Sequence, residues 1–247
     1  MKNVIGIIPA RYGSTRLEGK PLVDFHGKTM IQRVYEQAGK ALSYVLIATD
    51  DERIERVVKD FGGNVVMTSP DHTTGTNRCL EAYQIYTKQN DINFDVVLNI
   101  QGDEPLLVSD QITSLVSCFD VPNTKMATLV IPTKPGEDIE SGVFVTFDKN
   151  MDALYFSRSV IPFIRDEEKE SWTKNQTFYK HVGMYGFTPE ALVEFANLPE
   201  TTLEKSEKLE QLRWLENGNK IKVAITEHQS IPVDTAEDVE KVRRLLS

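Results

Sequence analysis

Residues 4–22 read VIGIIPARYGSTRLEGKPL. The apolar, β-branched start of this stretch predicts a strand that is buried on both faces. The strand stops at Pro9, and the next eleven residues include Arg11, Arg16 and Lys20 with two glycines and two aliphatic hydroxyls. Open α/β sheets bind ligands at the carboxyl ends of their strands, where cations neutralise phosphate and glycines allow close backbone approach. The stretch therefore predicts a phosphate-binding loop, with a solvated basic turn as the plainer alternative.

The composition limits the kind of partner. The chain has 247 residues, 40% of them hydrophobic and 26% charged, which allows one large globular domain or two small ones. Its net charge is −9, so no nucleic-acid partner is expected. Because the cations after Pro9 stand out against an acidic background, a small anionic ligand is favoured over a long polyanion.

The cysteine content and hydropathy indicate a compartment. Two cysteines, Cys79 and Cys118, lie far apart and in no metal-ligand spacing. This usage predicts a reducing environment and no disulfide framework. We expect no signal peptide and no membrane insertion, because no apolar run reaches the required length. The prediction is a cytoplasmic protein.

The first half of the chain alternates strands and helices. Buried strands are predicted at 44–48, 64–67 and 95–100, with amphipathic helices between them. Thr49-Asp50-Asp51-Glu52 is typical of a helix N-terminus, since it offers a capping side chain and acidic residues in the first turn. This β-α-β-α-β order predicts an α/β fold with a mostly parallel central sheet flanked by helices.

The second half has a different rhythm. Short strands are predicted at 127–131, 143–147, 153–156 and 181–187, and a turn at 148–150 should join two of them as a hairpin. One helix is expected over 203–217, and the last helix begins near Asp234. We expect a single α/β domain over residues 1–247 with a β-rich insertion at 127–187.

Two carboxylates are candidates for metal chemistry. Asp103 directly follows a predicted buried strand, and a carboxylate beside a phosphate loop suits Mg²⁺, which prefers oxygen ligands. Asp103 could equally cap the next helix. Asp234 lies between a strand and a helix, where an N-cap role is the commoner explanation.

Other polar residues are open to two interpretations. Arg78 is a helix-surface arginine or a contact to base or phosphate. Arg158 follows an apolar strand and either clamps a substrate carboxylate or forms a structural ion pair. His181 and Tyr185 alternate with apolar residues, so they should point to one face and form a joint site. Residues 210–213 are expected within a helix, where a solvated charged face is the plain interpretation.

Taken together, these motifs resemble those of the CMP-Kdo synthetases (3-deoxy-manno-octulosonate cytidylyltransferases). The resemblance runs in order from about residue 3 to the C-terminus. Besides the opening loop, it rests on Ala48-Thr49-Asp50, Gly75-Thr76 with Arg78, Gln101-Gly102-Asp103-Glu104-Pro105, Ala153-Leu154-Tyr155-Phe156-Ser157-Arg158, His181 with Tyr185-Gly186, Leu209-Glu210-Gln211-Leu212-Arg213 and Val233-Asp234-Thr235.

The resemblance implies a fold, a reaction and residue roles. The fold is of the nucleotide-diphospho-sugar transferase type, and its insertion at 127–187 also forms the contact of a homodimer. The reaction joins CTP and a 3-deoxy-ulosonic acid into a CMP-sugar and pyrophosphate, for lipopolysaccharide synthesis. Asp103 and Asp234 match the Mg²⁺ ligands and, with Arg11 and Lys20, the catalytic set. The nucleotide-binding positions are Ala10, Arg11, Ser14, Arg16, Lys20, Thr76, Arg78 and Gln101. The sugar-binding positions are Arg158, His181, Tyr185, Glu210 and Gln211.

The sequence departs from the family pattern at three positions; the change at Glu18 is peripheral, whereas those at Asn77 and Phe144 leave the exact sugar open. Glu18 stands where the loop usually has proline, Asn77 where an acidic residue usually precedes the arginine, and Phe144 where a lysine is expected. The 8-amino analogue of Kdo is one alternative substrate. A CMP-sialate-type synthetase and a non-catalytic nucleotide-binding module of the same fold are the rival functions.

Overall fold

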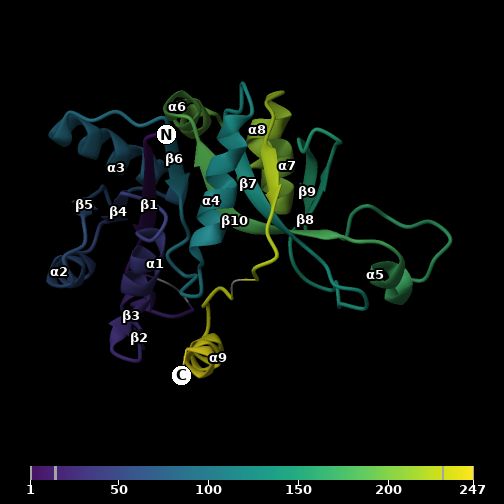
Figure 1. Cartoon of the computed structure of the whole chain (residues 1–247), viewed down its shortest axis with the longest axis horizontal. Helices are drawn as coiled ribbons and strands as arrows, with labels where there is room; N and C mark the ends of the chain where they lie inside the picture. The colour runs from purple at the N-terminus through teal and green to yellow at the C-terminus, as the bar shows by residue number, and fades with distance from the viewer. Residues whose placement is uncertain (1, 14–15, 230, 247) are drawn as a thin grey trace. The chain divides into compact units, whose positions relative to one another are not determined.

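The first apolar run forms strand β1 (Val4–Ala10), which pairs in parallel with one strand on each side (Figure 1). Ile5, Ile7 and Ile8 are fully buried, which confirms the prediction of a strand covered on both faces. Burying each such side chain contributes about 1.5–3 kcal/mol. The computed structural model describes residues 2–13, 16–229 and 231–246.

Contacts divide the chain into two compact units. The first comprises residues 1–113 and 230–247, and the second residues 114–229. The predicted insertion at 127–187 lies wholly within the second unit. Within the described residues no helix is long and apolar enough to cross a bilayer.

The first unit holds a parallel sheet in the order β6-β1-β4-β5. A small antiparallel pair, β2 with β3, lies outside it. Its other strands are β2 (Asp24–Phe25), β3 (Lys28–Thr29), β4 (Tyr44–Thr49), β5 (Val65–Met67) and β6 (Val96–Asn99). Its helices are α1 (Met30–Ala38), α2 (Glu52–Asp60), α3 (Gly75–Asn90), α9 (Ala236–Leu245) and a 3-10 turn, η1 (Lys20–Leu22). Helix α4 (Ser109–Ser117) spans the boundary at residue 113.

Side-chain caps fix where these helices begin. The Asp51 carboxylate accepts from the N–H of Arg53 at 2.9 Å, as the acidic helix start predicts. Thr74 caps α3 by accepting from the N–H of Asn77 at 3.2 Å. Thr235, not Asp234, caps α9, in a capping box with Asp238. Each such cap stabilises its helix by about 1 kcal/mol. The Asp234 N–H also donates to the Asp238 carboxylate, at 3.1 Å, but the Asp234 side chain takes no part in the cap.

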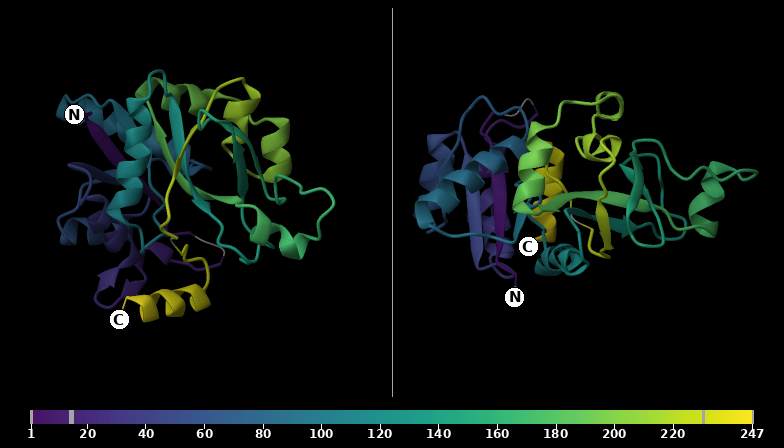
Figure 2. Two further views of the ribbon diagram at one scale, coloured as in Figure 1. Left: turned by 45° about the vertical axis from the view of Figure 1, so that its right-hand side comes forward. Right: turned by 90° about the horizontal axis from the view of Figure 1, so that it is seen from above.

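Within the first unit, the C-terminal segment packs against residues of the N-terminal part. Val233, Val239 and Val242 are buried against Phe25 and Met30. The Arg243 guanidinium also donates to the Asp24 carbonyl, at 2.9 and 3.2 Å. Figure 2 shows α9 beside the small β2–β3 pair. The end of the chain is therefore part of the same core as its beginning.

The second unit is mostly antiparallel, in the order β11-β7-β10-β8-β9, with only β11 and β7 parallel. The hairpin predicted through residues 148–150 is confirmed as β8–β9. The loop that carries α5 runs from the end of β9 to the start of β10 (Figure 2). The strands are β7 (Met126–Pro132), β8 (Phe144–Phe147), β9 (Ala153–Ser157), β10 (Tyr179–Phe187) and β11 (Lys222–Ile225). The helices are α5 (Trp172–Asn175), α6 (Pro189–Asn197), α7 (Thr202–Glu207), α8 (Leu212–Glu216) and the 3-10 turns η2 (Cys118–Asp120) and η3 (Lys169–Ser171).

The prediction of a single helix over residues 203–217 is wrong. Two short helices, α7 and α8, form instead, because Lys208 adopts a left-handed φ of 53° and its N–H closes on the Glu204 carbonyl. Arg213 and Glu204 then join the two helices through a buried ion pair. Residues 210 and 211 therefore lie in the turn between helices and not on a helix face.

Candidate active site

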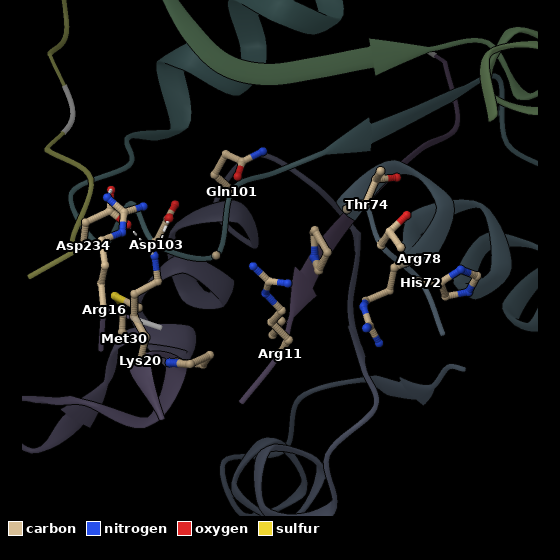
Figure 3. A pocket seen from close by; sticks show the side chains of 16 residues that line it. Arg11, Arg16, Lys20, Met30, His72, Thr74, Arg78, Gln101, Asp103 and Asp234 are labelled. Carbon is tan, nitrogen blue, oxygen red and sulfur yellow. Dashed lines mark hydrogen bonds and ion pairs between the residues drawn. The ribbon is translucent and has the colours of Figure 1, made fainter. Parts of the chain in front are cut away.

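A polar pocket lies at the carboxyl ends of β1 and β6 in the first unit (Figure 3). It encloses about 320 Å³. Four cationic side chains and two carboxylates face it. The lining residues are Pro9, Ala10, Arg11, Arg16, Lys20, Pro21, Met30, His72, Thr73, Thr74, Gly75, Arg78, Gln101, Gly102, Asp103 and Asp234.

Two backbone features shape the pocket floor. A Cβ atom on Gly102 would lie 3.1 Å from the Pro9 carbonyl oxygen, so glycine lets the turn after β6 pass close to the end of β1 without displacing that backbone. The N-terminus of α3 also opens into the pocket through Thr74 and Gly75. The helix dipole at this end favours an anion. The backbone of the pocket floor therefore favours phosphate binding independently of the side-chain cations.

The carboxylates of Asp103 and Asp234 meet at one ammonium group. Lys20 Nζ lies 2.7 Å from Asp103 Oδ2 and 3.1 Å from Asp234 Oδ1. Arg16 adds a further ion pair to Asp234, at 3.2 Å. The Val233 N–H donates to the Asp103 carbonyl at 2.9 Å, which ties the two segments together. Figure 3 shows these four side chains gathered on one side of the pocket.

Neither carboxylate acts as a helix cap. The helix after Asp103 begins only at Ser109, and α9 is capped by Thr235. The N-cap interpretations of Asp103 and Asp234 are therefore wrong. Both side chains face a cation, which is the arrangement that a bound cation would also use.

Arg78 lies on the other side of the pocket and is held by protein groups. Only 4% of the residue is exposed. Its guanidinium donates to Thr68 Oγ1 at 2.7 Å and to Asp50 Oδ2 at 2.8 Å. A buried arginine needs such partners, because an unpaired charge there would be costly. These bonds fix the orientation of the guanidinium before any ligand arrives.

Seven of the eight predicted nucleotide-binding residues are described, and six of them line the pocket: Ala10, Arg11, Arg16, Lys20, Arg78 and Gln101. Thr76 is absent from the lining, because its hydroxyl is buried on α3 and accepts from Asn99 at 3.5 Å. Ser14 lies outside the described residues.

His72, Thr74 and Met30 line the pocket and were not predicted. The capping hydroxyl of Thr74, just before an amphipathic helix, was a sequence signal for that position. His72 Nε2 lies 2.6 Å from a Glu81 carboxylate oxygen, which also accepts from the Ser69 N–H at 2.8 Å. Burial raises the pKa of Glu81, but these two hydrogen bonds, together with the charges of His72 and Arg78, hold the pKa below its ordinary value.

In the second unit, His181 and Tyr185 lie together as predicted, with ring centroids 5.3 Å apart. The strand β10 has a bulge between Val182 and Tyr185, a common device next to functional sites. The Thr128 hydroxyl lies 2.8 Å from the Met184 carbonyl and 2.9 Å from His181 Nε2. Because the hydroxyl has one proton and the carbonyl must accept it, His181 donates from Nε2 and keeps Nδ1 as an acceptor.

Burial sets the protonation of this pair. It lowers the pKa of His181 to about 3 and raises the pKa of Tyr185 well above its ordinary value, with a smaller contribution from the nearby Glu210 carboxylate. At neutral pH the imidazole is uncharged and the phenol keeps its proton. The pair therefore offers neutral hydrogen-bonding groups to a ligand.

The other three predicted sugar-binding residues are also in the second unit. Arg158 is exposed, and its Nε and Nη2 donate to the carbonyls of Glu207 and Lys208 at 2.6 and 3.3 Å. Gln211 is 2% exposed, and its side-chain nitrogen has no hydrogen-bond partner in the described part of the chain. A buried donor without a partner costs about 1–3 kcal/mol, which a ligand oxygen could recover.

His181 should make the protein less stable in acid. Its native pKa is depressed to about 3, whereas the unfolded chain binds the proton near pH 6.5. The contribution of His181 to the free energy of unfolding is therefore complete above pH 6.5. It falls as pH drops toward 3, by about 1–2 kcal/mol between pH 7 and pH 5. Urea unfolding of His181→Gln should show a shallower loss over this interval, while the exposed His26→Asn variant should keep the wild-type slope. Equal slopes for all three proteins would contradict the assignment.

Comparison with known proteins identifies the family of this chain. A family model described as cytidylyltransferase matches residues 5–221. A 3-deoxy-manno-octulosonate cytidylyltransferase of Parabacteroides distasonis is 52% identical over 253 residues, which cover 100% of this chain and 99% of the relative. The chain belongs to the cytidylyltransferase family.

Two further similar proteins have names that state the sugar on which they act. An 8-amino-3,8-dideoxy-manno-octulosonate cytidylyltransferase of a Shewanella species is 47% identical over 251 residues, with 99% of each chain covered. The solved structure of a CMP:2-keto-3-deoxy-manno-octonic acid synthetase complexed with CTP matches with a TM-score of 0.86 and 38% identity, over 98% of each chain. The resemblance to the CMP-Kdo synthetases and the α/β fold class are thereby confirmed.

Proposed function

We propose that this cytidylyltransferase activates 3-deoxy-manno-octulosonate, or its 8-amino analogue, with CTP to give the CMP-sugar and pyrophosphate. The observation that carries the proposal is the pocket of the first unit, where Arg11, Arg16 and Lys20 surround the paired carboxylates of Asp103 and Asp234. This set suits a metal-bound triphosphate. It occurs in a chain that matches relatives of this activity over almost its whole length.

Mg²⁺ fits the donor set at Asp103 and Asp234. Both carboxylates already approach one cation, the Lys20 ammonium, within 3.1 Å. No group of three or more histidine, cysteine, aspartate or glutamate ligands occurs in the described residues. Mg²⁺ suits such a sparse site, because it commonly takes one or two carboxylates and completes its shell with water and substrate phosphates. When bound, the metal would neutralise phosphate charge and polarise the α-phosphate.

The residues around the carboxylates would hold the phosphates. Arg11, Arg16 and Lys20 reach the pocket from the loop after β1, and the N-terminus of α3 faces it. As the anomeric hydroxyl of the sugar attacks the α-phosphorus, negative charge moves onto the departing pyrophosphate. Preorganised cations and N–H groups stabilise that charge, and they are the main protein contribution to phosphoryl-type transfer.

The remaining pocket residues would bind the nucleoside. We assign this role to Ala10, Arg78 and Gln101, which line the pocket. Ser14 and Thr76 stay predicted nucleotide contacts. Arg78 needs no rearrangement to present its guanidinium edge, since Asp50 and Thr68 already hold it. Fixed groups lose little conformational entropy on binding.

The second unit would bind the sugar. His181, Tyr185 and Gln211 offer neutral or unpaired polar atoms, whereas Arg158 and Glu210 supply charge. The ulosonate carboxylate is the natural partner of a guanidinium. In this assignment Arg158 would exchange its carbonyl partners at the end of α7 for the substrate.

The identity of the sugar stays open between two candidates. Phe144, at the position where a lysine is expected, is fully buried with Ile139, Trp172 and Phe178. The 8-amino sugar is a second candidate beside 3-deoxy-manno-octulosonate itself, because a relative named for that activity is 47% identical to this chain.

The reaction can be tested by pyrophosphate release. With CTP and Mg²⁺, release should require a 3-deoxy-ulosonic acid, and kcat/KM should be compared between 3-deoxy-manno-octulosonate, its 8-amino analogue and a sialic acid. Release with a sialic acid alone would replace the proposed substrate. No release with any acid, together with normal CTP binding by calorimetry, would favour the non-catalytic nucleotide-binding module.

The assembly and location belong to the same proposal. We expect a homodimer formed through residues 127–187, which light scattering on the purified chain would test. We expect the enzyme to work in the cytoplasm and to supply lipopolysaccharide synthesis. Its acidic net charge fits small-molecule substrates and no nucleic-acid partner.

A further inference from the structure

A contact outside the pocket holds the loop that carries its cations. The Arg53 guanidinium lies over the Tyr12 ring, with its carbon atom 3.2 Å from the ring centroid. Tyr12 is the second residue after β1, and Arg53 belongs to the first turn of α2. The loop thus rests on a helix of the same unit.

Arg53 is itself fixed. Its Nε and Nη2 donate to the two carboxylate oxygens of Asp51 at 2.9 and 2.7 Å, and the Arg53 N–H donates to the same carboxylate. The bidentate bond to Asp51 raises the pKa of Arg53, with smaller contributions from Tyr12 and Glu18. The charge of Arg53 is therefore compensated within the protein, and a planar group is held ready to stack.

The Tyr12 ring also reaches the far end of the loop. The Gly19 N–H donates to the Tyr12 carbonyl at 3.0 Å, and Gly19 has a φ of 68°. A Cβ atom on Gly19 would lie 3.1 Å from the Tyr12 ring, so the ring packs directly on this glycine. Gly19 immediately precedes Lys20 and caps η1. One aromatic ring therefore joins the entrance of the loop, its exit and α2.

We propose that Arg53 is a positioning residue for the triphosphate, because its stack on Tyr12 sets the conformation in which Arg11, Arg16 and Lys20 meet the ligand. The proposal rests on the function proposed above. Arg53 does not line the pocket, and its charge is used by Asp51. Arg53 therefore acts by ordering the loop before the ligand binds, so that binding loses less conformational entropy.

The position and not the charge of Arg53 should matter. In Arg53→Ala we expect the Kd of a non-hydrolysable CTP analogue and the KM of CTP to rise about threefold to tenfold, the range of a lost cation–π contact, with kcat changed less than twofold. Arg53→Lys keeps the charge but loses the planar stack and the bidentate bond, so it should not restore affinity. Arg56→Ala, on the same helix and exposed, is the matched control and should behave as wild type.

A double-mutant cycle isolates the contact. Tyr12→Phe should keep wild-type affinity, because the ring remains. Tyr12→Ala should weaken CTP binding, and adding Arg53→Ala to it should cost little more, because both changes remove the same stack. Additive losses, or full rescue by Arg53→Lys, would overturn the proposal.

Hydrogen exchange gives a readout that needs no CTP. In the free protein, backbone amides of residues 10–13 and 16–22 should exchange faster in Arg53→Ala than in wild type, while those of β4 should not change. Unaltered exchange in these two ranges, with normal CTP turnover, would overturn the proposal and leave the proposed function standing. Faster exchange in a protein that binds no CTP would instead refute the proposed function and leave the loop contact standing.

Discussion

Replacing Asp103 with asparagine should lower kcat/KM for CTP at least about a thousandfold and leave the fold intact. The change removes one of the two carboxylates that meet at Lys20, while the Asp103 carbonyl can still accept from the Val233 N–H. The side chain is 26% exposed and caps no helix, so little packing is lost. Pyrophosphate release measures the activity, and calorimetric unfolding checks the fold.

Asp110→Asn is the matched control for this variant. Asp110 is an exposed aspartate in the first turn of α4, outside the pocket lining, so its loss should change kcat/KM less than twofold. Wild-type turnover in Asp103→Asn would rule out Asp103 as a metal ligand. Unfolding of that variant would point to Asp234→Asn as the cleaner test, because Asp234 is 34% exposed and its neighbour Thr235 provides the cap.

Replacing Lys20 with methionine should reduce turnover about a hundredfold or more and at the same time create a metal site in the free protein. In the wild type, Lys20 and Arg16 together balance the two negative charges of Asp103 and Asp234. A divalent ion would therefore gain little electrostatic binding energy from this cluster, whose net charge is zero. Without Lys20 the carboxylates repel each other and attract a cation instead.

Electron paramagnetic resonance with Mn²⁺ measures this second effect. Free Mn²⁺ should bind Lys20→Met more tightly than the wild type in the absence of CTP, by about tenfold, and should raise its unfolding temperature. Lys28→Met is the control, since Lys28 is paired with the exposed Glu36 and lies outside the pocket. Equal Mn²⁺ affinity of wild type and Lys20→Met would show that the lysine does not compete with the metal.

Local sequence rules predicted much of the fold. The burial of β1 followed from its unbroken β-branched run, and the start of α2 followed from Asp51. The hairpin β8–β9 followed from a polar turn between two apolar runs. These features depend on neighbours in the chain, which is why a sequence pattern can predict them.

Features that depend on distant partners were not predictable in this way. The break between α7 and α8 follows from the left-handed Lys208 and from the Arg213–Glu204 pair, neither of which has a local sequence signal. For the same reason, the sequence did not distinguish a cap from a cation ligand at Asp234. That distinction depends on Lys20, which is more than two hundred residues away in the chain.

The same distance has a consequence for protein synthesis. The first unit contains residues 1–113 and 230–247, and Val233, beside Asp234, packs with α9 against Phe25 and Met30. A ribosome must therefore translate past residue 234 before the paired carboxylates can exist. Chains that stop short of residue 234 would lack this pair and could not assemble the pocket.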